Sequence, residues 1–212
     1  GCYSVMPATF TLNINAQISN VNVSSSNQVY IIGDIASALT ATANSGMTLR
    51  WWGQLQGGTQ LTAPVIPLTN SVGVVNYYVD QFESNGSGCS SPERVLVTVT
   101  TNPTMPDISG NTNINGNVLT YCQNASAIAL TATPITGGTL NWYTTANGNT
   151  QPTTLVPSTS NVGTTSYYVA QTINGLTSAR ARIDVVISQS PTLSGSNTGN
   201  IMGEASPFAG NT

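Results

Sequence analysis

The chain has 212 residues, a formal net charge of -3, no histidine, and only 5% charged residues against 39% hydrophobic ones. Its polar surface is therefore built from hydroxyl and amide side chains, since Thr, Asn and Ser number 31, 23 and 23. With no lysine and four arginines the chain cannot offer a basic surface to nucleic acid or anionic lipid, and no apolar run approaches the roughly 20 residues that span a bilayer.

The sequence repeats itself at a spacing of 90 to 91 residues. Residues 1–18 look like the C-terminal end of one copy, and residues 19–102 and 103–189 form two complete units. The matching segments are Leu39-Thr40-Ala41-Thr42 with Leu130-Thr131-Ala132-Thr133, Trp51-Trp52 with Trp142-Tyr143, and Tyr77-Tyr78-Val79 with Tyr167-Tyr168-Val169. Residues 190–212 repeat an opening, with Pro191 in the place of Pro103. We therefore predict two complete repeats, each large enough for one core, between two incomplete ones.

The recurring segments have the alternation of short β-strands. Val, Ile, Thr, Tyr and Trp alternate over short stretches that clusters of turn residues separate. Four Asn-Gly steps suit the positive φ angles of tight hairpins: Asn85-Gly86, Asn115-Gly116, Asn147-Gly148 and Asn174-Gly175. About seven such strands per repeat predict an all-β fold, in which immunoglobulin-like β-sandwich domains follow one another as a string. Trp51 and Trp142 would be the core tryptophans, and Tyr77 and Tyr167 the inward tyrosines of a late strand.

The motifs of the second unit carry a family resemblance. They are Tyr121-Cys122, Leu130-Thr131-Ala132-Thr133, Gly138-Thr139-Leu140-Asn141-Trp142-Tyr143, Pro157-Ser158-Thr159, Gly163-Thr164-Thr165 and Tyr167-Tyr168-Val169. This pattern resembles the Ig-like repeats of very large cell-surface proteins of Bacteroidota, which include gliding-motility adhesins exported by the type IX secretion system. The resemblance implies a non-catalytic part of an adhesin that is exported across the outer membrane and acts at the cell surface, in attachment or gliding motility.

The cysteines depart from the resembled pattern, which implies one cysteine at the Tyr-Cys position and one at the later Gly-Cys step, tying strands within a repeat. The first unit has Ile31 and Cys89 at these positions, and the second has Cys122 and Leu176. We therefore expect no disulfide within either complete repeat, so that these cysteines and Cys2 are unpaired or in intermolecular bonds. A strand length of about 30 Å disfavours a bridge between Cys89 and Cys122. We expect the cysteines to be buried.

Candidate ligand-binding residues follow from strand alternation. Where one aromatic residue faces the core, its neighbour in sequence faces outward, and the two strands concerned are adjacent in this fold. The expected exposed pairs are Trp52 with Tyr78 and Tyr143 with Tyr168. Rings side by side can stack on sugars, which would make each repeat bind polysaccharide or another surface glycan. They can also be cross-strand pairs that stabilise the sheet by roughly 0.2–1 kcal/mol each.

The residue inventory disfavours catalysis. Without histidine the commonest general base and the commonest zinc ligand are missing. Asp80 and Glu83 are close enough in sequence to share an acid-base or calcium site, but they lie where a predicted strand meets a turn, which is typical of solvated charges. We therefore predict that the chain is not an enzyme, and that it has no catalytic residue, cofactor or metal site.

Three functions remain, and the joints between units favour a stalk over the other two. A stalk needs only repeats in series, and Asn102-Pro103 and Ser190-Pro191 are short joints whose prolines restrict bending. A glycan-binding module and a self-assembling extracellular filament are the alternatives, because 72 uncharged residues separate Asp107 from Arg180 and offer hydrogen bonds to sugars or to another copy. The expected partners are other repeats of the same chain, surface glycans or the chain itself, without nucleic acid or membrane insertion.

Overall fold

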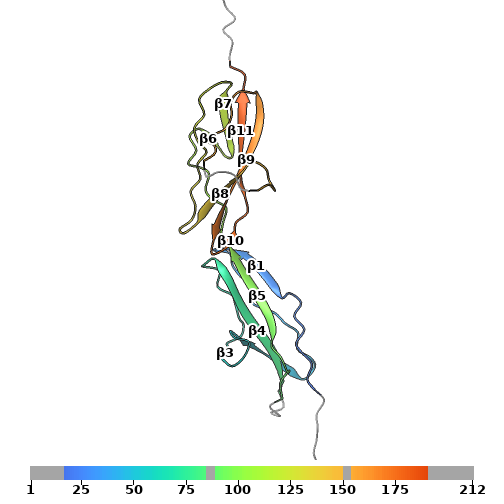
Figure 1. Cartoon of the computed structure of the whole chain (residues 1–212). Coiled ribbons are helices and arrows are strands. Elements are labelled where there is room, and N and C mark those ends of the chain that lie inside the picture. The colour runs from blue at the N-terminus through green and yellow to red at the C-terminus, as the bar shows by residue number, and fades with distance from the viewer. Residues whose placement is uncertain (1–16, 85–88, 150–153, 191–212) are drawn as a thin grey trace, which may run out of the picture.

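The computed structural model describes residues 17–84, 89–149 and 154–190, which fold into two β-domains placed end to end (Figure 1). None of these residues is helical, so the described part contains no helix that could cross a membrane. The prediction of tandem Ig-like domains in an all-β fold is confirmed. The predicted partial repeats lie outside the described residues, apart from residues 17, 18 and 190.

The first domain is built on one sheet with the order β1-β5-β4-β2-β3. Its strands are β1 (Asn27–Ile31), β2 (Met47–Trp52), β3 (Gln60–Leu61), β4 (Gly73–Glu83) and β5 (Val95–Asn102). β1 runs parallel to β5, and the other neighbours are antiparallel.

The second domain repeats this plan. Its strands are β6 (Ile114–Asn115), β7 (Val118–Cys122), β8 (Thr139–Tyr143), β9 (Gly163–Ile173), β10 (Leu176–Thr177) and β11 (Ala181–Ser188). β7 runs parallel to β11 as β1 does to β5, while β9 pairs antiparallel with β8, β10 and β11. β8 and β9 therefore correspond to β2 and β4.

The layer that faces each sheet is irregular, so the regular strands in the described residues number five and six rather than about seven per repeat. Single bridges hold this layer together, such as Asn22 with Thr42, and so do isolated backbone bonds, such as Leu39 N–H to the Val65 carbonyl at 2.8 Å. Prolines interrupt the facing segments, at Pro64, Pro67 and Pro157. Because proline has no N–H to donate, a continuous ladder cannot form there.

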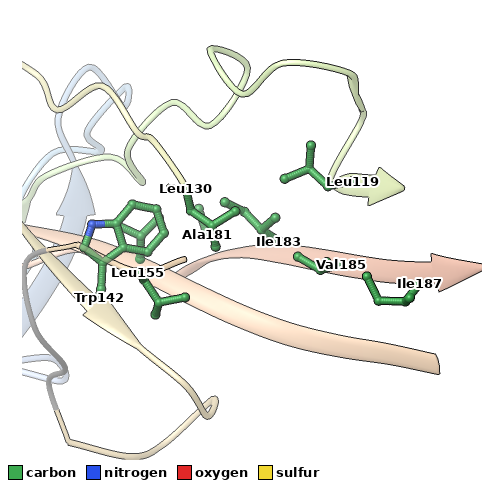
Figure 2. Close-up of a cluster of buried hydrophobic side chains, with 9 residues drawn as sticks. Leu119, Leu130, Trp142, Leu155, Ala181, Ile183, Val185 and Ile187 are labelled. Atoms are coloured by element: carbon green, nitrogen blue, oxygen red, sulfur yellow. The ribbon is translucent and has the colours of Figure 1, made fainter. Parts of the chain in front are cut away.

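Each domain has its own apolar core, which includes the predicted tryptophan. Trp51 and Trp142 are 4% and 3% exposed, and Tyr77 and Tyr167 pack against the two cores as predicted. Figure 2 shows Trp142 beside Leu130, Leu155 and Ala181, with the inward side chains of β11 continuing the cluster. The cluster of the second domain consists of Leu119, Leu130, Trp142, Leu155, Val169, Ala181, Ile183, Val185 and Ile187.

One of the four Asn-Gly steps forms the predicted two-residue hairpin turn. Asn174 and Gly175, between β9 and β10, have φ angles of 51° and 79°, as a tight hairpin requires. Gly116 alone is positive in the turn between β6 and β7, at 63°, and neither residue of Asn147-Gly148 is positive. Asn85-Gly86 lies outside the described residues.

A buried glutamine ties the start of each domain to its sheet. In the second domain, Gln171 is fully buried; its Oε1 accepts a hydrogen bond from Ile135 N–H, and its Nε2 donates to the Thr104 carbonyl, both at 2.8 Å. Gln81 makes the same two contacts in the first domain, with Asn44 N–H and the Ser19 carbonyl, also at 2.8 Å. The glutamine thus satisfies backbone groups that the irregular layer leaves without ladder partners.

Candidate functional site

The sheets bring the predicted aromatic residues together. Trp52 lies opposite Tyr78 on β2 and β4, and Tyr143 lies opposite Tyr168 on β8 and β9. Residues directly opposite in an antiparallel pair have their side chains on one face of the sheet. Each repeat therefore carries one cross-strand aromatic pair at the corresponding place.

Arginine side chains cover one ring of each pair. The guanidinium carbon of Arg94 lies 3.7 Å from the ring centroid of Trp52, and that of Arg180 lies 3.4 Å from the ring centroid of Tyr143. Tyr143 is only 8% exposed, so the expectation that its ring stands free on the surface is wrong. Sequence alternation correctly gives the side of the sheet, but it cannot show that a residue 37 or more positions away lies on top of the ring.

Hydrogen bonds hold both arginines in place. Arg94 Nη1 donates to the carbonyls of Gln54 and Gly57, at 2.7 and 2.8 Å. Arg180 donates through Nη1 to the carbonyls of Thr145 and Ala146, at 2.9 and 2.6 Å, and through Nη2 to that of Gly148, at 2.8 Å. Each arginine thus fastens the loop after the tryptophan strand to the sheet. A sugar that stacks on these faces would have to displace the guanidinium, so glycan binding there stays a prediction.

Asp80 is a buried charge and not the solvated carboxylate that its place near a turn suggested. It is 5% exposed, and Arg50 Nε donates to its Oδ1 at 2.8 Å, with Arg94 Nε 3.7 Å from its Oδ2. Asp80 lies three positions from Glu83 on β4, and side chains three apart on a strand face opposite sides. The two carboxylates therefore do not share a site. Among the described residues, no three Asp, Glu or Cys side chains gather as metal ligands do.

A cleft of about 530 Å³ opens beside this charge cluster in the first domain. Its lining residues are Leu55, Gln56, Gly57, Asp80, Ser90, Ser91, Pro92, Glu93 and Arg94. The second domain differs here by one residue, because two residues separate Ser91 from Arg94 whereas only Ala179 separates Ser178 from Arg180. Sequence reasoning missed this cleft, although the offset between the two repeats falls from 90 residues at Tyr77 and Tyr167 to 86 at Arg94 and Arg180, which marks the place.

The two described cysteines are exposed and not buried as expected. Cys89 and Cys122 are both exposed, which corrects the expectation of burial; Cys2 lies outside the described residues. Cys122 points away from the core because its neighbours on β7, Leu119 and Tyr121, pack into it.

The within-repeat link that the resemblance implied is out of reach. The Tyr-Cys position of the first domain is Ile31, which pairs with Asn102 at the end of β5, whereas Cys89 precedes the start of that strand. At about 3.3 Å per residue, the eight residues of β5 place the two positions roughly 25 Å apart. A disulfide needs Cα atoms within about 7 Å, so no bond could join these positions within one repeat.

The joint between the domains contains no free linker. β5 ends at Asn102, Pro103 is fully buried, and the Thr104 carbonyl already accepts the hydrogen bond from Gln171 of the second domain. The hairpin turn between β9 and β10 reaches the first domain, where Asn174 Nδ2 donates to the Val72 carbonyl at 3.1 Å. The two domains are therefore joined both along the chain and by a contact between residues 102 positions apart.

Comparison with known proteins agrees with this architecture. The family model described as Ig-like domain, CHU_C associated, matches residues 19–103 and 110–191. No curated protein matches the chain.

Solved structures with some likeness include other tandem modules. The fibronectin(III)-like modules of Clostridium thermocellum CbhA are 14% identical with a TM-score of 0.32, over 80% of this chain and 93% of that one. Human mucin-like protocadherin EC1-2 is 10% identical with a TM-score of 0.30, over 80% and 98%. The N-terminal Ig1-2 module of Drosophila receptor protein tyrosine phosphatase DLAR is 12% identical with a TM-score of 0.29, over 81% and 97%.

Proposed function

Because the chain belongs to the family of CHU_C-associated Ig-like domains, of which it holds two copies in series, we propose that it is a non-catalytic stalk segment of a large cell-surface adhesin. In such a stalk, rigid domains hold a distal binding part away from the cell. Domains of this family are typical of Bacteroidota surface proteins. The proposal places the chain outside the outer membrane, after type IX secretion, in surface attachment or gliding motility.

The joint is the observation that carries the proposal. Pro103 is the only residue between the last strand residue of the first domain and the anchored Thr104, and proline fixes its own φ and restricts the residue before it. The contact between Asn174 and Val72 adds a second point of attachment, so rotation about the chain path breaks a hydrogen bond. A joint of this kind resists bending, as a spacer of defined length requires.

The surface chemistry also suits a spacer. The second domain has no charged residue between Asp107 and Arg180, and Arg180 is held by three carbonyls. A neutral surface neither attracts nor repels its neighbours over a Debye length. The shape of the stalk should therefore be insensitive to salt.

Small-angle scattering over a concentration series of the whole chain tests the proposal. We expect a rod two domains long at every concentration and salt level. Insertion of Gly-Ser-Gly-Ser between Asn102 and Pro103 should shorten the mean end-to-end distance, since such linkers behave as flexible coils. The matched control places the same four residues between Gly58 and Thr59, which are both exposed, and should leave the rod unchanged.

Other outcomes point to the alternatives. Growth into longer species with concentration would favour a self-assembling filament. Polysaccharide binding that is lost in Trp52→Ala or Tyr143→Ala would favour a glycan-binding module. A compact or freely bending particle without any insertion would contradict the stalk.

A further inference from the structure

The end of the second domain farthest from the joint is built like the end of the first domain that forms the joint. In the first domain, Gly33 N–H donates to the Thr69 carbonyl at 2.9 Å, and Thr69 Oγ1 donates to the Asp34 carbonyl at 2.5 Å. In the second domain, Asn124 N–H and Thr159 make the same two bonds, at 2.9 and 2.7 Å. The same loop framework therefore holds Val72 in the first domain and Val162 in the second, each directly before the glycine at which β4 or β9 begins.

That residue is a valine in both domains, but its exposure differs. Val72 is 9% exposed, whereas Val162, its counterpart, is 56% exposed. Val72 does not belong to the buried core cluster of the first domain, so its own domain's core does not account for its burial. Its carbonyl is the group that accepts the hydrogen bond from Asn174 of the second domain. Val72 is thus buried beside the contact between the domains, and Val162 is its exposed counterpart at the other end of the second domain.

We propose that the end of the second domain around Val162 is a docking surface for a further Ig-like repeat placed in series, which enters with its Asn-Gly hairpin turn. This inference rests on the proposed function as a stalk and names the contact that would propagate it. An occupant has to cover an apolar side chain and donate one hydrogen bond to the backbone carbonyl beside it. At the existing joint, the side-chain amide of Asn174, which lies in a turn at positive φ, donates this hydrogen bond to the Val72 carbonyl.

The path of the chain selects a following repeat over a second molecule. At the joint, Ile32 N–H donates to the Asn102 carbonyl at 2.8 Å, just before Pro103 leads into the next domain. At the other end, Gln123 N–H donates to the Ser188 carbonyl at 2.8 Å, and Ser190 Oγ donates to the Gln123 carbonyl at 3.0 Å. The chain therefore leaves the second domain at the same place, beside Val162.

A chain with a second copy of residues 103–188 inserted between Ser188 and Gln189 tests the inference, because Ser188 corresponds to Asn102 and the inserted Pro103 then follows it directly. Valine methyl groups are observed by NMR in the presence of a soluble gadolinium chelate, which broadens exposed methyl signals. In the 212-residue chain we expect strong broadening of Val162 and weak broadening of Val72. In the three-repeat chain, the broadening of the first Val162 should fall to the level of Val72.

A matched pair of variants isolates the turn. Asn→Gly at the inserted copy's counterpart of Asn174 keeps the positive φ but removes the amide donor, and it should return Val162 to strong broadening while Val72 stays protected. Asn174→Gly in the original copy should give strong broadening of Val72 while the first Val162 stays protected. A second chain carries residues 18–102 at the same place, with residues 84–88 of the insert replaced by Asn-Gly to match the turn between β9 and β10. It decides the matter if the first chain loses its dispersed valine signals, and the same protection is expected.

The outcomes separate this inference from the proposed function. If Val162 stays broadened in a folded three-repeat chain while Val72 is protected, the docking surface is refuted and the joint of the stalk stands. If Val72 is broadened as strongly as Val162 in the 212-residue chain, the joint itself does not form, and both the inference and the proposed stalk fail.

Discussion

Replacement of Gln171 by methionine should destabilise the second domain by about 2–4 kcal/mol. The side chain is fully buried and makes two hydrogen bonds of 2.8 Å, with Ile135 N–H and the Thr104 carbonyl. Each lost bond costs about 1 kcal/mol, and each backbone group left without a partner adds about 1 kcal/mol because the site is only part-buried at its edges. Methionine has a similar volume, so the cavity term is small.

The change should be large in a melting experiment. For a domain of this size, 1 kcal/mol shifts the midpoint by roughly 4–8 °C, so we expect the second domain to melt roughly 10–25 °C lower. Amide NMR spectra recorded during heating follow the two domains separately, and the first domain serves as the internal reference. Gln81→Met should transfer the effect to the first domain, because Gln81 makes the same bonds there. A loss below 1 kcal/mol, or an equal loss in both domains, would refute the reasoning.

Three further predictions concern the charged side chains. Asp80→Ala should lower the free energy of unfolding by about 1–3 kcal/mol, because it leaves the guanidinium groups of Arg50 and Arg94 without their carboxylate. Adding Arg50→Asn should recover part of this loss in urea unfolding, since Asn141 and Ala170 occupy the same register in the second domain. If the losses of the two substitutions simply add, the reasoning is contradicted. Arg94→Ala should uncover Trp52 and increase acrylamide quenching of tryptophan fluorescence, whereas Arg180→Ala, which uncovers Tyr143, should change it little; equal quenching in both variants would mean that Arg94 is not the cover. Burial acts to raise the pKa of Asp184, but hydrogen bonds from Ser166 and Arg182 outweigh it and hold the pKa below its usual value. The carboxylate's contribution to stability is therefore complete above about pH 4 and is lost as the pH falls through the lower folded-state pKa; an NMR titration should show Ser166→Ala raising that pKa, and an unchanged titration would refute the assignment.

The aromatic and charged residues show where sequence reasoning stops. Alternation predicted that Trp52 and Tyr78 share a sheet face, and the register of β2 and β4 places them opposite each other. The same reasoning took Asp80 for a solvated charge, because its partner Arg50 is 30 positions away and no local pattern links them. Arg94, which covers the ring of Trp52, is likewise 42 positions away in sequence.

The sequence by itself determined the repeats, the strands and the core tryptophans, because the 90-residue spacing and the two-residue period of a strand are local properties of the chain. Only the tertiary structure decided which surfaces are open. Val72 and Val162 stand in equivalent positions, and nothing near them in sequence distinguishes a buried valine from an exposed one. Val72 lies beside the joint, where its carbonyl accepts a hydrogen bond from Asn174, 102 positions away, whereas Val162 lies at the other end of the second domain, and burial is set by what packs against a residue in space.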